Sequence, residues 1–155
     1  MEGDRVPSPE EPIEERLLFL QENMVSFVNQ FNMPIIEVSL VLSKYIRIIL
    51  DSLLEAADSQ GESLPQNLVE SWPIETYPDA PTIDSFPLDK LLGSLDEDRM
   101  DILDTLIRSI LNESRLPFVP ALTLLREWEQ LARIQLSQAN SPGHLFSPME
   151  FPEGF

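Results

Sequence analysis

Two long apolar segments separated by a single proline constrain the fold of this 155-residue chain more than any other feature. Residues 17–31 and 35–54 are almost continuously apolar, and the Met33-Pro34 step lies between them. Proline disfavours helical backbone at the preceding residue but fits the first turn of a new helix. The sequence therefore predicts two helices within residues 12–58, with the break at Met33-Pro34. The first has one apolar face with helical spacing, formed by Leu17, Leu20, Met24, Phe27, Val28 and Phe31.

The second segment is apolar on nearly all of its sides, which is typical of a central helix covered from several directions. Its start, residues 35–42, is rich in β-branched residues and also fits a buried strand. The length of the segment and its lack of glycine favour the helix.

A second pair of helices is predicted in residues 88–138. Ser94 and Glu97 have the spacing of a capping box at a helix start, and apolar residues then recur with helical spacing to about Asn112. Pro117 interrupts this pattern, and a last helix is expected from about Pro120 to Ser137.

These patterns predict an all-α fold in which two helical hairpins, 12–58 and 88–138, form a four-helix bundle within a helical domain 12–138. The proline-rich crossover 59–87 joins the hairpins, and it either drapes Trp72, Tyr77 and Phe86 across the helices or is a mobile linker. The acidic N-terminus 1–11 is expected to be disordered, and the Phe- and Pro-rich tail 139–155 to be flexible.

The composition limits the class of partner. With 27 acidic and 10 basic residues, the formal net charge is −17, and the acids are spread along the chain. Such a molecule is repelled by phosphate backbones, so no direct nucleic-acid binding is expected, and a protein with a basic or apolar groove is the natural partner. The charges within residues 35–54 argue against a membrane span. The absence of cysteine and of an apolar leader predicts a cytoplasmic or nuclear location, or both.

No residue pattern indicates catalysis. The single histidine, His144, lies in the tail, where a general base would lack an orienting partner. The chain contains no phosphate-binding loop, nucleophile elbow or metal motif. We therefore expect no enzymatic activity, no cofactor and no metal site.

The remaining function class is protein binding. We expect a non-enzymatic interaction module, an acidic helical adaptor or regulatory subunit of a larger complex. Assembly as a homo-oligomer and as a hetero-oligomer are both left open. Three tail phenylalanines have little reason to stay exposed, so they either fold back onto the helices or insert into a partner. The candidate binding residues are Tyr45, Ile46, Ile49, Trp128, Phe146, Phe151 and Phe155. For Tyr45, Ile46 and Ile49, a place in the core is the favoured alternative.

A short leucine motif adds three candidates. Residues 88–92 read Leu-Asp-Lys-Leu-Leu, so Leu88, Leu91 and Leu92 form one ridge on a helix. The motif resembles the L-x-x-L-L box with which coactivators dock into nuclear-receptor grooves, although ordinary core packing gives the same pattern. The wider segment 83–111 resembles acidic-hydrophobic activation segments. A transcriptional coregulator that uses this segment is therefore the alternative function.

Three serines precede proline in segments expected to be flexible, namely Ser8, Ser141 and Ser147. They are candidate phosphorylation sites, and a phosphate on Ser147 would place charge among the tail aromatics.

Overall fold

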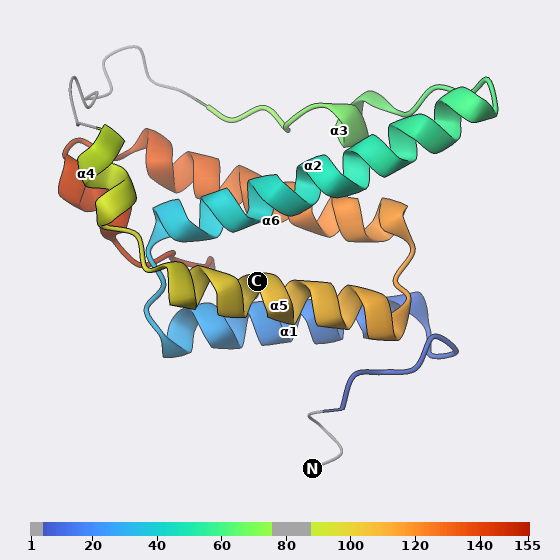
Figure 1. Ribbon diagram of the computed structural model, residues 1–155, viewed down its shortest axis with the longest axis horizontal. Helices are drawn as coiled ribbons and strands as arrows, with labels where there is room; N and C mark the ends of the chain where they lie inside the picture. Colours follow the sequence, from blue (N-terminus) through green and yellow to red (C-terminus); the bar gives the residue numbers. More distant parts are fainter. Residues whose placement is uncertain (1–4, 76–87) are drawn as a thin grey trace.

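The computed structural model describes residues 5–75 and 88–155, and each regular element within these ranges is a helix (Figure 1). This confirms the predicted all-helical class. The elements are α1 (Ile13–Gln30), α2 (Ile35–Ser59), α3 (Gln66–Val69), α4 (Leu88–Gly93), α5 (Glu97–Ser114), α6 (Phe118–Ser137) and the 3₁₀ helix η2 (Pro142–Phe146). None of the helices in the described ranges is both long enough and apolar enough to cross a membrane.

The break between α1 and α2 is a Schellman turn. Asn32 has a φ of 47°, a left-handed conformation that asparagine tolerates better than most residues. The Met33 N–H donates to the Val28 carbonyl at 3.0 Å, and the Asn32 N–H donates to the Asn29 carbonyl at 3.3 Å. The Met33 side chain is fully buried, so the turn both ends α1 and fills the core.

The four long helices pair between the two halves of the chain rather than within them. α2 packs most extensively on α6, and α1 packs on α5, with further contacts of α2 to α5 and of α1 to α6. In Figure 1 α1 and α5 run side by side below α2 and α6. The predicted arrangement of two hairpins, 12–58 and 88–138, in a four-helix bundle is not confirmed. The short α1–α2 and α5–α6 connections instead join helices that make few direct contacts with each other.

One core is shared by both halves. Its fully buried side chains come from α1, α2, α5 and α6, and Trp128 of α6 is the largest. The others of similar burial include Leu20, Met24, Met33, Ile35, Leu42, Leu103, Ile107, Leu122 and Leu125. Because both halves contribute, neither pair of helices has a separate core.

The start of α5 differs from the prediction. Asp96 is the N-cap, and its carboxylate accepts a hydrogen bond from the Arg99 N–H at 3.1 Å. The Ser94 hydroxyl donates instead to the Lys90 carbonyl at 2.8 Å. The predicted capping box is therefore wrong by two residues. A tertiary contact takes its place, because the Asp96 N–H donates to the carboxylate of Glu37 on α2 at 3.1 Å.

The described part of the crossover, residues 60–75, lies along α6. Leu68 in α3 is buried, and Arg126 of α6 donates to the Leu68 and Val69 carbonyls at distances of 3.0–3.2 Å. Farther along α6, Arg133 donates to the Trp72 carbonyl. The crossover is thus held mainly through its backbone and Leu68, while the Trp72 ring is half-exposed. Tyr77 and Phe86 lie outside the described residues.

Both ends of the chain contact the domain where they are described. Within the N-terminal segment, Val6 packs against the core. Within the tail, where we expected no fixed structure, η2 contacts α2, and Met149 is buried.

Candidate protein-binding surfaces

Four of the predicted binding residues belong to the core. Tyr45, Ile46 and Ile49 on α2 and Trp128 on α6 are each less than a tenth exposed. The sequence left open whether Tyr45, Ile46 and Ile49 form core or interface, and in the structure they lie in the core. These side chains cannot contact a partner without a rearrangement of the domain.

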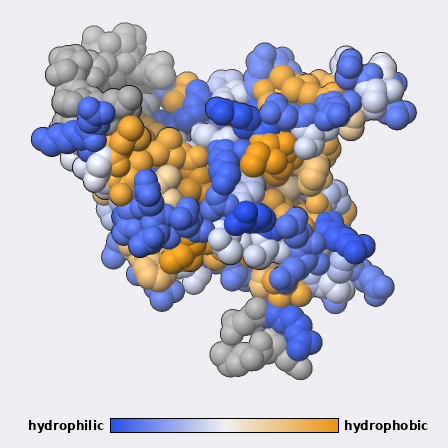
Figure 2. Space-filling view, viewed as in Figure 1, coloured by the Kyte–Doolittle hydropathy of each residue, from blue (hydrophilic) through white to orange (hydrophobic). Residues whose placement is uncertain are grey.

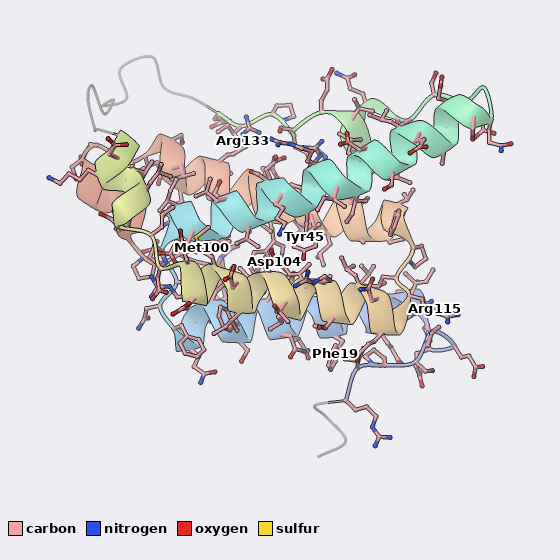
Figure 3. The ribbon with its side chains drawn as sticks, in the orientation of Figure 1. Phe19, Tyr45, Met100, Asp104, Arg115 and Arg133 are labelled. Atoms are coloured by element: carbon pink, nitrogen blue, oxygen red, sulfur yellow. The ribbon has the colours of Figure 1, made fainter. Side chains whose placement is uncertain are left out.

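Tyr45 and Asp104 form a polar contact between α2 and α5 (Figure 3). The Tyr45 hydroxyl donates to the Asp104 carboxylate and to the Asp104 carbonyl, and Lys44 pairs with the same carboxylate. Burial and the hydrogen bond to Asp104 raise the pKa of Tyr45 above its usual range. Burial works to raise the pKa of Asp104, but the hydrogen bonds from Lys44 and Tyr45 outweigh it and hold that pKa below its ordinary value. This charged group joins two helices, so we assign it a structural role.

Glu37 forms a second polar contact between these helices, at the start of α2. Its carboxylate has no exposed surface and accepts hydrogen bonds from Arg99 Nε at 2.7 Å and Arg99 Nη2 at 2.8 Å. The pairing raises the pKa of Arg99, although partial burial opposes this. Together with the Asp96 N–H, these contacts fix the start of α5, and therefore the residues that directly follow α4, against the first turn of α2.

The leucine ridge of α4 borders this fixed region. Leu92 is 53 % exposed and Leu91 is half-buried, while the side chain of Leu88 lies outside the described part of the structure. Figure 2 shows apolar atoms gathered over the region where Figure 1 places α4 and the starts of α2 and α5. Met100, at the start of α5 in Figure 3, is also only partly covered. Among the predicted binding residues with described side chains, Leu92 is the one with the largest exposed area fraction.

The tail phenylalanines fold back onto the domain. Phe151 and Phe155 each contact Trp128 edge-on, with ring centroids 5.1 and 5.4 Å away, and they stack on each other at 5.4 Å. Phe146 is half-buried at the end of η2. Of the two outcomes that we considered for the tail, docking on its own domain is the one found here.

The three serine candidates lie in different settings. Ser8 is exposed, and its hydroxyl accepts a hydrogen bond from the Glu10 N–H at 3.3 Å. Ser141 and Ser147 are half-buried at the two ends of η2. The Ser147 carbonyl accepts the Ile35 N–H at 2.8 Å, so this residue belongs to the contact between the tail and α2.

Sequence reasoning missed the polar residues that hold the segments together. Arg126 is 4 % exposed and uses all of its side-chain nitrogens, on Leu68, Val69, Ser71 and Glu129. Its position beside Leu125, within the apolar face of α6, could have indicated a buried role. Gln135 of α6, whose side-chain amide bonds to the tail backbone at Pro148 and Glu150, was also missed, and as an ordinary polar residue on a helix it gave no comparable indication.

No cluster of three or more potential metal ligands occurs among the residues that the structure describes. The His144 ring accepts a hydrogen bond from the Asn140 N–H at 3.1 Å through Nδ1, which accounts for it within the tail turn.

Comparisons with known proteins give no guide to the function. No protein-family model matches the chain, and neither the curated proteins nor the solved structures provided a match. The function is therefore inferred from the surfaces described above.

Proposed function

We propose that this protein is a non-enzymatic protein-interaction module, an acidic helical adaptor or regulatory subunit, and that it binds its partner through the leucine ridge of α4. The observation that carries this proposal is the exposure of Leu92 on a short helix that directly precedes the anchored start of α5. A small apolar ridge held on a rigid base loses little conformational entropy when it enters a groove. A cytoplasmic or nuclear setting is part of the same proposal.

The charges around α4 suggest the chemistry of the partner. Asp89, Asp96, Glu97 and Asp98 are all exposed, and Lys90 is the single exposed base among them. An apolar groove with basic residues at its rim would complement both the ridge and its acidic surroundings. The net charge of −17 would also accelerate association with such a surface at low ionic strength.

The alternative, a transcriptional coregulator acting through residues 83–111, is less well supported. Leu103, Ile107 and Ile110 of that segment are buried in the core shared with the other helices. A segment that must unfold from its own domain to bind would have to give up this burial, whereas Leu92 on α4 is already exposed.

The test compares two charge substitutions at exposed apolar positions. Leu92→Asp removes the ridge, and the matched control Ile102→Asp alters α5, where Ile102 is 52 % exposed. Each variant and the wild type are used as baits in cells of the source organism, and the recovered complexes are sized. We expect one stoichiometric partner that is lost with Leu92→Asp, kept with Ile102→Asp and released by high salt.

Two results would contradict the proposal. A partner retained equally by both variants would place binding elsewhere. A wild-type bait recovered as a lone monomer would argue against an adaptor of any kind.

A further inference from the structure

Residues 147–155 lie on the domain in the way that a peptide ligand lies in a receptor groove. Pro148 forms an isolated antiparallel bridge with Pro34, and two backbone hydrogen bonds flank it. The Ile35 N–H donates to the Ser147 carbonyl at 2.8 Å, and the Met149 N–H donates to the Met33 carbonyl at 3.2 Å. The α1–α2 turn therefore pairs with the tail as one strand pairs with another.

A glutamine side chain binds the other edge of the same backbone. Gln135 Nε2 donates to the Pro148 carbonyl at 2.9 Å, and Gln135 Oε1 accepts the Glu150 N–H at 3.0 Å. These contacts require no particular side chain at Pro148 or Glu150. They hold an extended backbone in a fixed register, which leaves selectivity to the side chains that point into the domain.

Three apolar side chains supply that selectivity. Met149 is 3 % exposed, and Phe151 and Phe155 pack on the fully buried Trp128. A turn brings the two rings together, because the Phe155 N–H donates to the Pro152 carbonyl at 3.1 Å and Gly154 has a φ of 82°. Glycine accepts that conformation without strain, so the recognised pattern is apolar-x-Phe-x-x-Gly-Phe.

The groove continues beyond the tail. A cavity of about 450 Å³ lies beside Phe155 and Gly154, between Leu18 and Val25 of α1 and Glu127 of α6. Leu18 is 54 % exposed at this point. A longer ligand therefore has apolar surface available that residues 147–155 do not cover.

The segment between α6 and Ser147 lies largely at the surface, although Ala139 within it is buried and η2 contacts α2. Gln138, Asn140, Gly143 and His144 are exposed in the stretch between α6 and Ser147. Release of residues 147–155 would require loss of the contacts described above, while the four long helices keep their shared core.

We propose that this groove, formed by Met33, Ile35, Trp128, Gln135 and the cavity beside Leu18, is a peptide-recognition site. Its ligand is a segment of a partner protein with the pattern apolar-x-Phe-x-x-Gly-Phe, and residues 147–155 are an intramolecular occupant that competes with that ligand. This site is separate from the α4 ridge, and either proposal can fail without the other.

The first experiment uses a fluorescein-labelled peptide of residues 145–155 as the probe. In the full chain, Phe151→Ala with Phe155→Ala weakens the tail and frees the groove. By fluorescence anisotropy, we expect the peptide to bind this double variant at least about tenfold more tightly than the wild type, whose own tail competes at high effective concentration. The matched control Phe118→Ala changes an exposed phenylalanine at the start of α6 and should behave like the wild type.

Changes in the probe and in the groove test the recognised pattern. A peptide with Gly154→Ala should bind the double variant at least about tenfold more weakly, because its turn is strained. Gln135→Leu, added to the double variant, should weaken binding of the unaltered peptide, whereas Gln138→Leu, at an exposed position near the end of α6, should not.

Three outcomes would overturn the proposal. One is a double variant that melts cooperatively yet does not bind the peptide. If the double variant does not fold, Gly154→Ala in the full chain replaces it in the experiment. The second outcome is that this variant binds the peptide no more tightly than the wild type does. The third is a concentration-dependent wild-type dimer that the tail substitutions abolish, since this would assign the groove to the tail of a second copy.

Discussion

Glu37 and Arg99 form a two-point ion pair between α2 and α5, in which the Glu37 side chain has no exposed surface while the Arg99 side chain remains 24 % exposed. The same carboxylate accepts the Asp96 N–H and so satisfies one of the unpaired groups at the start of α5. One buried acid thus determines where α5 begins and how α4 is presented.

Removing only the base should be costly. Arg99→Met leaves Glu37 buried without its cation, and we expect the free energy of unfolding to fall by about 3 kcal/mol. Replacing both residues with methionine should cost less than Arg99→Met alone, because no uncompensated charge is left in the interior. Urea unfolding of the two single variants and the double variant measures the coupling.

The matched control for that series is Arg108→Met on the same helix. Arg108 is exposed and lies 3.9 Å from Asp104, so its loss should cost less than about 1 kcal/mol. Equal costs for Arg99→Met and Arg108→Met would show that the burial of Glu37 has little energetic consequence.

Arg126 should control the docking of the crossover. Arg126→Met removes every side-chain hydrogen bond from this residue to Leu68, Val69 and Ser71, and residues 60–75 should open more often. We expect a protease specific for glutamate to cut after Glu70 at least about tenfold faster than in the wild type. The exposed arginine Arg47 provides the control, since Arg47→Met should leave the cleavage rate unchanged.

The contact of Asp104 with Tyr45 and Lys44 predicts a pH dependence. Since the folded-state pKa of Asp104 lies below its ordinary value of 3.8, its charged form stabilises the fold above about pH 4. That contribution is lost as the pH falls through the lower folded-state pKa. Asp104→Asn should therefore reduce the unfolding free energy by about 1–2 kcal/mol at pH 7, and the difference from the wild type should shrink towards pH 3. Urea titrations at pH 7, 5 and 3 measure it, and a difference independent of pH would argue against the ionised contact.

The loss of stability caused by substitutions in the tail should have an upper limit. If residues 147–155 leave the domain as a unit, as the proposed peptide site requires, no substitution there can cost more than the free energy of tail docking. Met149→Ala and Phe151→Ala should therefore be less than additive when combined. Leu125→Ala in the shared core has no such limit and should cost about 3 kcal/mol. Additive losses in the tail, measured by thermal unfolding, would show that it is an integral part of the core.

The positions of the long helices could be predicted closely from sequence. The expected break at Met33-Pro34 lies between α1 and α2, and α6 ends at Ser137 as predicted. These features are local, because proline geometry and apolar spacing act within a few residues. The start of α5 was misplaced because a carboxylate 59 residues away, Glu37, satisfies the Asp96 N–H.

Little of the candidate binding surfaces could be predicted from sequence. Tyr45 and Leu92 both lie in apolar-rich segments that the sequence predicts to be helical, yet Tyr45 is buried and Leu92 is exposed. Whether each side chain is buried depends on which helices pack together. Here α1 pairs with α5, and α2 with α6, across the two halves of the chain. Sequence spacing reports which face of a helix is apolar but not which neighbour covers it.

The sequence alone determined that this protein is helical and where the chain breaks between α1 and α2, since both follow from residue type and local spacing. Only the tertiary structure decided that the crossover is held by Arg126 and that the tail occupies a groove beside Trp128. Those contacts join residues far apart in the chain or depend on how the helices pack. Their free energy depends on burial and geometry that exist only after the helices have assembled.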